Sequence, residues 1–303
     1  MNGTDHSISF PDDQVIENLK IYPYSVTRKI SDNGVGKNEN NLDVQLRFFK
    51  GTDLPNIEEW LLQLFLSEKL GQTKATNIIA QVKNVLTSGL LPDVNGLDIK
   101  SIESGNSFEN FIEFTTDYGK VRLKDLGYGY QSMMGWVLDL VRRMVERYPS
   151  VEKPLEQPAI VLVDEIDLHL HPEWQRKIIA HLTKYFPKTQ FIVTAHSPLI
   201  VQSAERVNVV LLKKEGDHVT IEQPTIKNFR GWTVDEILED LMQLGDHVMS
   251  DTYLNLVHDF DAALDTDDFE KAEKAYKSLS QILHPQSNRR KLMEIQMTSL
   301  SPA

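Results

Sequence analysis

The fold is decided by residues 159–198, which read AIVLVDEIDLHLHPEWQRKIIAHLTKYFPKTQFIVTAHSP. Two apolar runs, 159–163 and 190–194, are continuous rather than alternating, which is typical of strands buried on both faces of a parallel sheet. A helix is expected between them, from Pro172 to about Tyr185, because proline is favoured in the first turn of a helix. The order strand, helix, strand predicts a right-handed parallel crossover in an α/β fold.

Two carboxylates, Asp164 and Glu165, directly follow the first run. Open parallel sheets bind ligands at the carboxyl ends of their strands, where one carboxylate can hold Mg²⁺ and the other can deprotonate an attacking water. His196 follows the second run and is expected at the same edge, where an imidazole can contact a γ-phosphate. The acid pair alone is compatible with a strand that ends at the surface. Together with His196, it favours a nucleotide-bound metal.

A glycine-rich turn, Leu126–Ser132, precedes a helix expected from Gly135 to Arg147. Backbone N–H groups and the helix dipole make such a turn a potential anion site, although glycines also form ordinary turns.

The rest of the chain is assigned from its hydrophobic pattern. The expected elements are helices at 57–70 and 76–86, strands at 97–102, 108–116 and 121–123, a third buried strand at 207–212 with a hairpin partner at 219–223, and helix from Thr233 with Pro285 as its only breaker.

Composition excludes several classes of protein. The 303 residues include 32 Lys and Arg and 44 Asp and Glu, a formal charge of −12, so a general basic footprint for nucleic acid is missing and nucleic-acid binding is unsupported by charge. Residues 232–303 carry 14 acids and 6 bases, or −8, and we interpret them as a solvated helical tail. The absence of cysteine excludes disulfides and fits a cytoplasmic protein, and no apolar run is long enough to span a membrane.

The chain resembles the ABC/SMC-type branch of P-loop ATPases, and more narrowly the AAA family ATPases of Septu and retron antiphage systems. The resemblance lies in residues 120–215, where 159–165 match the Walker B strand, 167–175 the D-loop and its helix, 191–198 the switch-histidine segment and 126–132 the signature loop. It implies a P-loop NTPase core of the ABC-head type, with a parallel sheet, a helical insertion and a helical C-terminal tail.

The resemblance also implies a mechanism. Two ATPase heads enclose ATP and Mg²⁺ between them, so a homodimer of heads is expected, with a partner effector, plausibly a nuclease, that responds to the nucleotide. The roles implied for this chain are Asp164 for Mg²⁺, Glu165 as general base, His196 at the γ-phosphate, Asp167 at the contact between heads, and Gly127, Gly129 and Ser132 near the phosphates bound by the partner head.

The phosphate-binding loop departs from the family pattern. No stretch reads Gly, four residues, Gly-Lys-Ser/Thr, and the nearest match, 31–38, has Asn38 after Gly36-Lys37 and is interpreted as a surface loop. The chain is therefore expected to represent the C-terminal two-thirds of such an ATPase, with an incomplete N-terminal lobe. Gly127 also stands where the family usually has serine.

We expect three regions: 1–120, an incomplete N-terminal lobe with a helical segment; 121–231, the ATPase core; and 232–303, an acidic helical tail. The favoured function is an ATP-driven switch, and the alternatives are a non-hydrolysing scaffold and a DNA-repair type of ATPase. His169 and His171 have no evident third partner for zinc, and the aspartates at 259–268 are interpreted as a solvated loop.

Overall fold

A computed structural model of the protein describes residues 21–31, 53–91, 93–205, 207–244 and 249–300. The chain forms two compact units, one of residues 1–210 with 223–231 and the other of residues 211–222 with 232–303.

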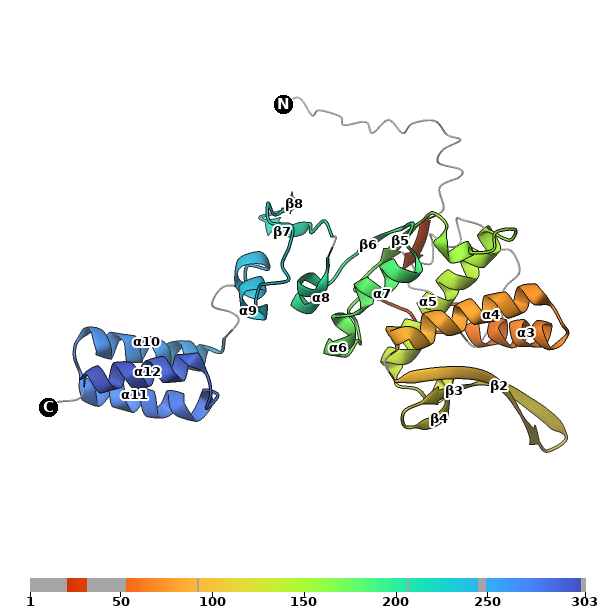
Figure 1. Cartoon of the computed structure of the whole chain (residues 1–303). Helices are drawn as coiled ribbons and strands as arrows, with labels where there is room; N and C mark the ends of the chain where they lie inside the picture. Colours follow the sequence, from red (N-terminus) through yellow and green to blue (C-terminus); the bar gives the residue numbers. More distant parts are fainter. Residues whose placement is uncertain (1–20, 32–52, 92, 206, 245–248, 301–303) are drawn as a thin grey trace, which may run out of the picture. The chain divides into compact units, whose positions relative to one another are not determined.

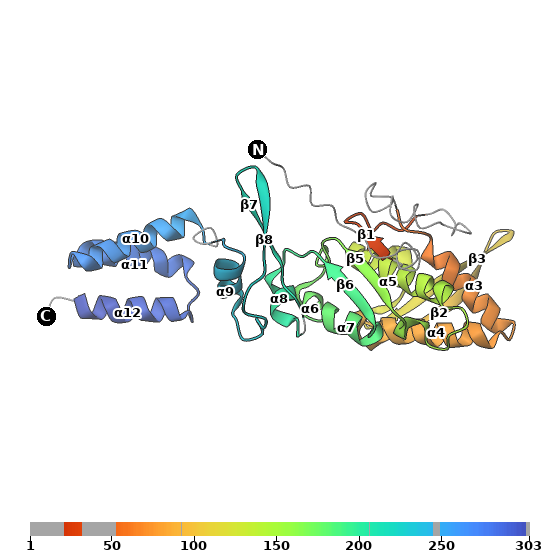
Figure 2. The ribbon, with the colours of Figure 1, turned by 90° about the horizontal axis from the view of Figure 1, so that it is seen from above.

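The first unit contains a parallel sheet of strand order β1–β5–β6, drawn in Figures 1 and 2. Its strands are β1 (Ile21–Tyr24), β5 (Ala159–Val163) and β6 (Thr189–Val193). Val161 of β5 pairs with Tyr22 on one side and with Phe191 on the other. The two apolar runs are thus adjacent parallel strands, and the predicted α/β class with a parallel sheet is confirmed.

The two strands differ in how much of their side chains is buried. Val161 and Val163 of β5 are 0% and 2% exposed, whereas Ile192 of β6 is 52% exposed. β6 is an edge strand of the sheet as far as the structure describes the chain, while β5 has a neighbour on each side. The prediction of burial on both faces is therefore wrong for β6.

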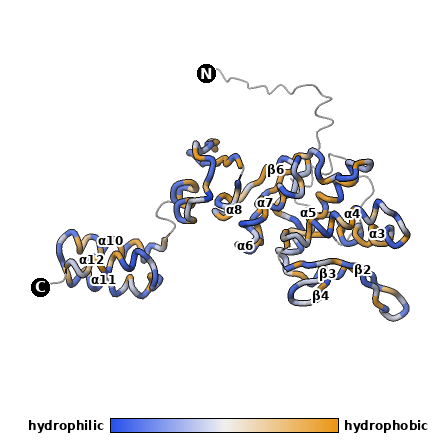
Figure 3. Tube along the Cα trace, in the orientation of Figure 1, coloured by the Kyte–Doolittle hydropathy of each residue, from blue (hydrophilic) through white to orange (hydrophobic). Residues whose placement is uncertain are grey.

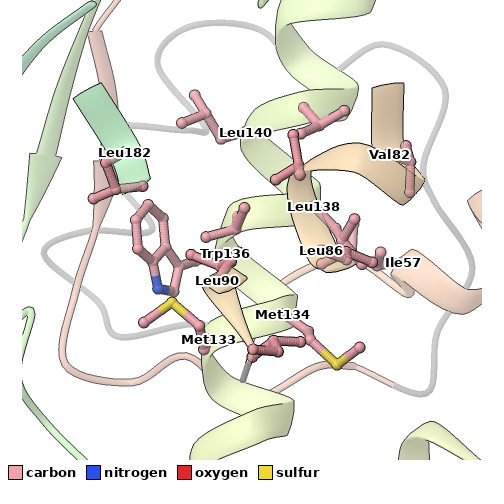
Figure 4. Close-up of a cluster of buried hydrophobic side chains, with 14 of the residues drawn as sticks. Ile57, Val82, Leu86, Leu90, Met133, Met134, Trp136, Leu138, Leu140 and Leu182 are labelled. Atoms are coloured by element: carbon pink, nitrogen blue, oxygen red, sulfur yellow. The ribbon is translucent and has the colours of Figure 1, made fainter. Parts of the chain in front are cut away.

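Helix α5 (Tyr128–Arg147) supplies much of the core of this unit. Trp136, Leu138 and Leu140 are fully buried, and Figure 4 shows them among side chains of the neighbouring helices. Those helices include α3 (Ile57–Lys69), α4 (Thr73–Val85) and a short π-helix (Leu86–Leu90). The two helices expected at 57–70 and 76–86 are thus confirmed.

The start of α5 differs from the prediction. The helix begins at Tyr128 rather than Gly135, because Gly127 serves as its N-cap and the amide of Gln131 donates to the Gly127 carbonyl at 3.1 Å. The predicted turn is therefore the first part of the helix. Gly135 then lies inside α5, where a Cβ atom would stand only 3.0 Å from a side-chain carbon of Ile30.

An antiparallel sheet and several short helices complete the first unit. The sheet has the order β2 (Val94–Ser104), β3 (Ser107–Thr116), β4 (Gly119–Arg122), which confirms the three strands expected here. The short helices are 3-10 turns at Leu123–Asp125 and Pro154–Glu156 and the α-helices α6 (Pro172–Gln175), α7 (Ile178–Tyr185) and α8 (Pro198–Ser203). The single helix predicted after Pro172 is thus interrupted between α6 and α7.

The second unit begins with a hairpin of β7 (Leu211–Glu215) and β8 (His218–Glu222). The hairpin partner at 219–223 is confirmed, but the buried strand predicted at 207–212 is wrong. β7 starts later and, among the described strands, pairs with β8 alone. Leu212 is 67% exposed, so the apolar residues of β7 belong to an open two-stranded ribbon.

Three helices follow in the same unit: α10 (Asp251–Asp265), α11 (Phe269–Ile282) and α12 (Asn288–Leu300). They share a small core that includes Phe260, Leu279 and Met293, and Figure 3 shows apolar and polar residues alternating along each helix. A short α9 (Val234–Glu236) and a π-helix (Ile237–Leu241) precede them.

Two predictions for the tail need correction. Pro285 is not its only breaker, because α10 ends at Asp265 and a turn with Asp267 at a φ of 53° separates it from α11. Asp259, Asp261 and Asp265 are exposed as expected, but they lie on α10 rather than in a loop. Among the helices that the structure describes, none is long and apolar enough to cross a membrane.

Candidate functional site

The acid pair lies where β5 and β6 end together. The Asp164 amide donates to the Tyr24 carbonyl at 2.9 Å, and the Thr194 amide donates to the Val163 carbonyl at 3.0 Å, so both ladders continue one residue beyond the strands. The Thr194 hydroxyl then donates to Asp164 Oδ1 at 2.6 Å and accepts from the Glu165 amide at 2.7 Å. One hydroxyl thus joins the acid pair to the end of the neighbouring strand.

Glu165 lies in a tight turn. Its φ is 47°, in the left-handed region that side chains other than glycine rarely occupy. The Ile166 amide donates to the Thr194 carbonyl at 2.9 Å, and the buried Arg28 donates through one Nη to the carbonyls of Asp164 at 3.0 Å and Glu165 at 2.5 Å. Contacts from both sides therefore fix the turn.

The amide of His196, which the sequence predicts beside the acid pair, contacts Asp167. The His196 amide donates to the two carboxylate oxygens of Asp167 at 3.3 and 3.2 Å, while the His196 ring is exposed. Gln175 extends this connection, because its amide nitrogen donates to the Asp167 carbonyl at 3.4 Å and its oxygen accepts from Ser197 at 2.7 Å. Two hydrogen-bonded groups therefore follow the ends of β5 and β6, one of Asp164, Glu165 and Thr194 and the other of Asp167 and His196.

The glycine-rich turn is packed against the segment that follows the acid pair. A Cβ atom at Gly129 would stand 2.4 Å from the His169 carbonyl oxygen, and the rings of Tyr128 and His169 meet edge to face at 4.8 Å. Gly127 is exposed, but Ser132 is only 4% exposed and faces the core. The contact expected between Ser132 and a partner-bound phosphate would require this hydroxyl to become exposed.

His169 and His171 have local structural roles. His169 adopts a φ of 62° beside Gly129, and His171 caps α6 by accepting from the Glu173 amide at 3.3 Å. No cluster of three or more potential metal-binding side chains occurs within the described residues.

The donors at the edge fit Mg²⁺ carried by a nucleotide. Asp164 and Glu165 offer carboxylate oxygens and Thr194 a hydroxyl, and Mg²⁺ typically uses one or two carboxylates with water and phosphate oxygens. The near match to a phosphate-binding loop, 31–38, lies almost wholly outside the described residues.

Sequence reasoning missed two residues of the site. Thr194 is the last residue of the run 190–194, and only the pairing of β5 with β6 shows that its hydroxyl reaches both members of the acid pair. Arg28 lies more than a hundred residues earlier in the chain, and no local pattern marks it as a partner of the turn.

Residues 10–202 match the family model described as "AAA domain, putative AbiEii toxin, Type IV TA system". The Septu protein PtuA of Bacillus thuringiensis is 34% identical over 208 residues, covering 67% of this chain and 52% of that protein. The Retron Ec83 probable ATPase of Escherichia coli is 33% identical over 178 residues, covering 57% of this chain and 32% of that protein. The matched region thus spans about half of the first relative and a third of the second, and the resemblance expected from the sequence is confirmed.

Among solved structures, a chain from a study titled "Structural biochemistry of ATP-driven dimerization and DNA stimulated activation of SMC ATPases" aligns with a TM-score of 0.39 and 13% identity. The alignment covers 59% of this chain and 96% of the other. That likeness is too slight to support a conclusion about this protein.

Proposed function

The chain belongs to the family of AAA domains described as putative AbiEii toxin, Type IV TA system, and from this membership we propose that it is the core of an ATP-hydrolysing switch of an antiphage system. The observation that carries the proposal is the joined edge of β5 and β6, where Thr194 links Asp164 and Glu165 beside His196. The similarity to a Septu protein and a retron probable ATPase supports the antiphage context. We propose residues 121–231 as the ATPase core.

Each residue of the edge has a task in this proposal. Bound Mg²⁺·ATP supplies the phosphoryl group and the cation that neutralises its charge. Asp164 would hold the cation, Glu165 would accept the proton of the attacking water, and His196, with its exposed ring, would contact the γ-phosphate. Asp167 would act at the contact between two heads, and Gly127, Gly129 and Ser132 would lie near the phosphates bound by the partner head, which for the buried Ser132 requires its hydroxyl to become exposed.

The first prediction is that Glu165→Gln nearly abolishes ATP hydrolysis in the full-length protein that contains this chain. The amide keeps the size of the side chain but cannot accept a proton, and a general base contributes about 10²–10⁴-fold to the rate. Steady-state phosphate release measures the effect. Glu173→Gln is the matched control, because Glu173 is an exposed residue of α6 whose side chain pairs with Lys177. The control variant should hydrolyse ATP at the parent rate.

The same variant tests the switch. If hydrolysis opens a closed dimer of heads, the Glu165→Gln protein should accumulate as an ATP-held dimer, which light scattering with and without ATP detects. Parent-rate hydrolysis by Glu165→Gln would show that another group is the base. An effector that responds to the closed state, plausibly a nuclease, would complete the switch.

A second candidate is a scaffold that does not hydrolyse ATP. The observation that favours it is the missing Gly-x4-Gly-Lys-Ser/Thr pattern, since hydrolysis then needs a phosphate-binding loop from outside these residues or from a second chain. Full-length protein that assembles with its partner equally well with and without ATP would support the scaffold.

A further inference from the structure

Arg28 is a buried cation beneath the acid pair. It is 2% exposed and follows β1, whose last residue, Tyr24, accepts a hydrogen bond from the Asp164 amide. Beyond Arg28 the chain is held again, because the Lys29 carbonyl accepts from the Leu54 amide at 2.7 Å. The backbone on each side of Arg28 is thus fixed, and the guanidinium has a defined place.

The contacts of Arg28 are to the main chain. One Nη donates to the successive carbonyls of Asp164 and Glu165. Successive residues of a strand point in opposite directions, so two successive carbonyls converge on one cation only where the strand has ended in a turn. The φ of 47° at Glu165 provides this turn. By contrast, the buried Arg142 binds the carboxylates of Asp139 and Glu146.

Three carboxylates of the site partly offset the cost of burying the Arg28 charge. Burial lowers the pKa of the Arg28 guanidinium, and the carboxylates of Asp164, Glu165 and Asp167 act in the opposite direction. The Arg28 Nε is buried and has no hydrogen-bond partner among the described residues. A buried arginine with an unsatisfied donor is costly for stability alone, which indicates a role in the site.

We propose that Arg28 is a positioning residue of the candidate ATPase site. Arg28 holds the turn at Asp164 and Glu165 in the conformation that directs one carboxylate to the cation and the other to the attacking water. This inference rests on the proposed function for its meaning in catalysis. Its structural part, the control of the turn by Arg28, stands on the hydrogen bonds alone.

The test is hydrogen exchange in the purified chain with Arg28→Met. The amides to follow are Ile166, which donates to the Thr194 carbonyl, and Leu168, which donates to the Glu165 carbonyl that Arg28 also binds. Because the charged hydrogen bonds of Arg28 are lost, the exchange of these two amides should accelerate about tenfold or more. Arg28→Lys should give a smaller selective increase, because an ammonium does not reproduce the planar fork of a guanidinium.

Arg142→Met is the matched control, since it removes a buried arginine of the same unit that does not contact the turn. It should lower stability without selective exchange at the turn. The proposal is overturned if Arg28→Met leaves the exchange rates of the two turn amides unchanged. It is also overturned if Arg28→Met raises exchange throughout the unit to the same extent, as Arg142→Met is expected to do. If Arg28→Met does not fold, Arg28→Lys decides, and unchanged exchange in that variant overturns the proposal.

Activity gives a second readout. In the full-length protein, Arg28→Lys should lower kcat about tenfold or more with little change in KM, because the turn directs groups that act in the chemical step. If the parent protein does not hydrolyse ATP, the proposed function fails, and the exchange experiment still decides whether Arg28 holds the turn.

Discussion

At the scale of single residues, the site depends on contacts that only certain side chains can make. Thr194 serves both acids because a hydroxyl can donate and accept at once. Gly129 has a different importance from the one expected from its place in a glycine-rich turn. Because Gly129 has no Cβ, α5 can approach the His169 carbonyl. Gly129 therefore has a packing role within this unit, independent of any contact with phosphate.

We predict that Gly129→Ala destabilises the first unit by about 1–3 kcal/mol, the usual cost of forcing an extra methyl group into a packed site. The new Cβ would be 2.4 Å from a backbone oxygen, which cannot move aside as a flexible side chain could. Urea unfolding measures the loss.

Gly231→Ala is the control, because no heavy atom lies within 4 Å of the Cβ that it would add. Equal stability of the two variants would show that the segment around His169 yields to the added methyl group.

At the scale of elements, a buried ionic network joins β1 to α5. Asp139 is 0% exposed and accepts from Arg142 at 2.8 Å, from Arg143 at 2.6 Å and from the Tyr24 hydroxyl at 3.1 Å. The carbonyl of the same Tyr24 receives the Asp164 amide. Helix α5, which begins at the glycine-rich turn, is therefore tied to the strand that supports the acid pair.

We predict that Asp139→Asn costs about 3–5 kcal/mol, because it leaves the buried Arg142 and the partly buried Arg143 without their shared carboxylate. Glu146→Gln is the matched control on the same helix. Glu146 also pairs with Arg142, but its side chain is 56% exposed, so its removal should cost less than about 1 kcal/mol. Chemical denaturation of the two variants compares them, and equal costs would contradict the importance of the buried pair.

The same network gives a pH dependence. Burial by itself raises the pKa of Asp139, but Arg143 and Arg142 outweigh it and hold the pKa below its ordinary value. Since the unfolded pKa is about 3.9, this stabilisation is present above about pH 4 and is lost as the pH falls through the lower folded value. Denaturation midpoints between pH 7 and pH 3 should therefore fall less steeply in Asp139→Asn than in the parent.

At the scale of the whole molecule, the chain consists of two units with separate cores. We predict that deletion of residues 249–303, which removes the core shared by α10, α11 and α12, shifts the melting temperature of the first unit by less than about 3 °C. Circular dichroism and calorimetry of both forms measure it. A deletion variant that no longer melts cooperatively would show that the first unit needs these helices.

A further prediction concerns ATP binding by the isolated chain. Much of the phosphate affinity of P-loop proteins comes from a backbone cradle and a lysine, and the sequence contains no match to that motif. We expect weak binding by titration calorimetry. Micromolar affinity for ATP would contradict this, and would make the segment 31–38 a degenerate phosphate loop.

The sequence by itself determined the two adjacent parallel strands β5 and β6 and the helical crossover between them, and it placed the acid pair and His196 directly after those strands. It did so because continuous apolar runs, a proline at a helix start and residues at strand ends act through local rules. Only the tertiary structure decided that β6 is exposed, that Gly129 meets His169, and that Arg28 binds the carbonyls of the turn. Each of these depends on which distant segments lie side by side, and no pattern within one stretch of the chain specifies that.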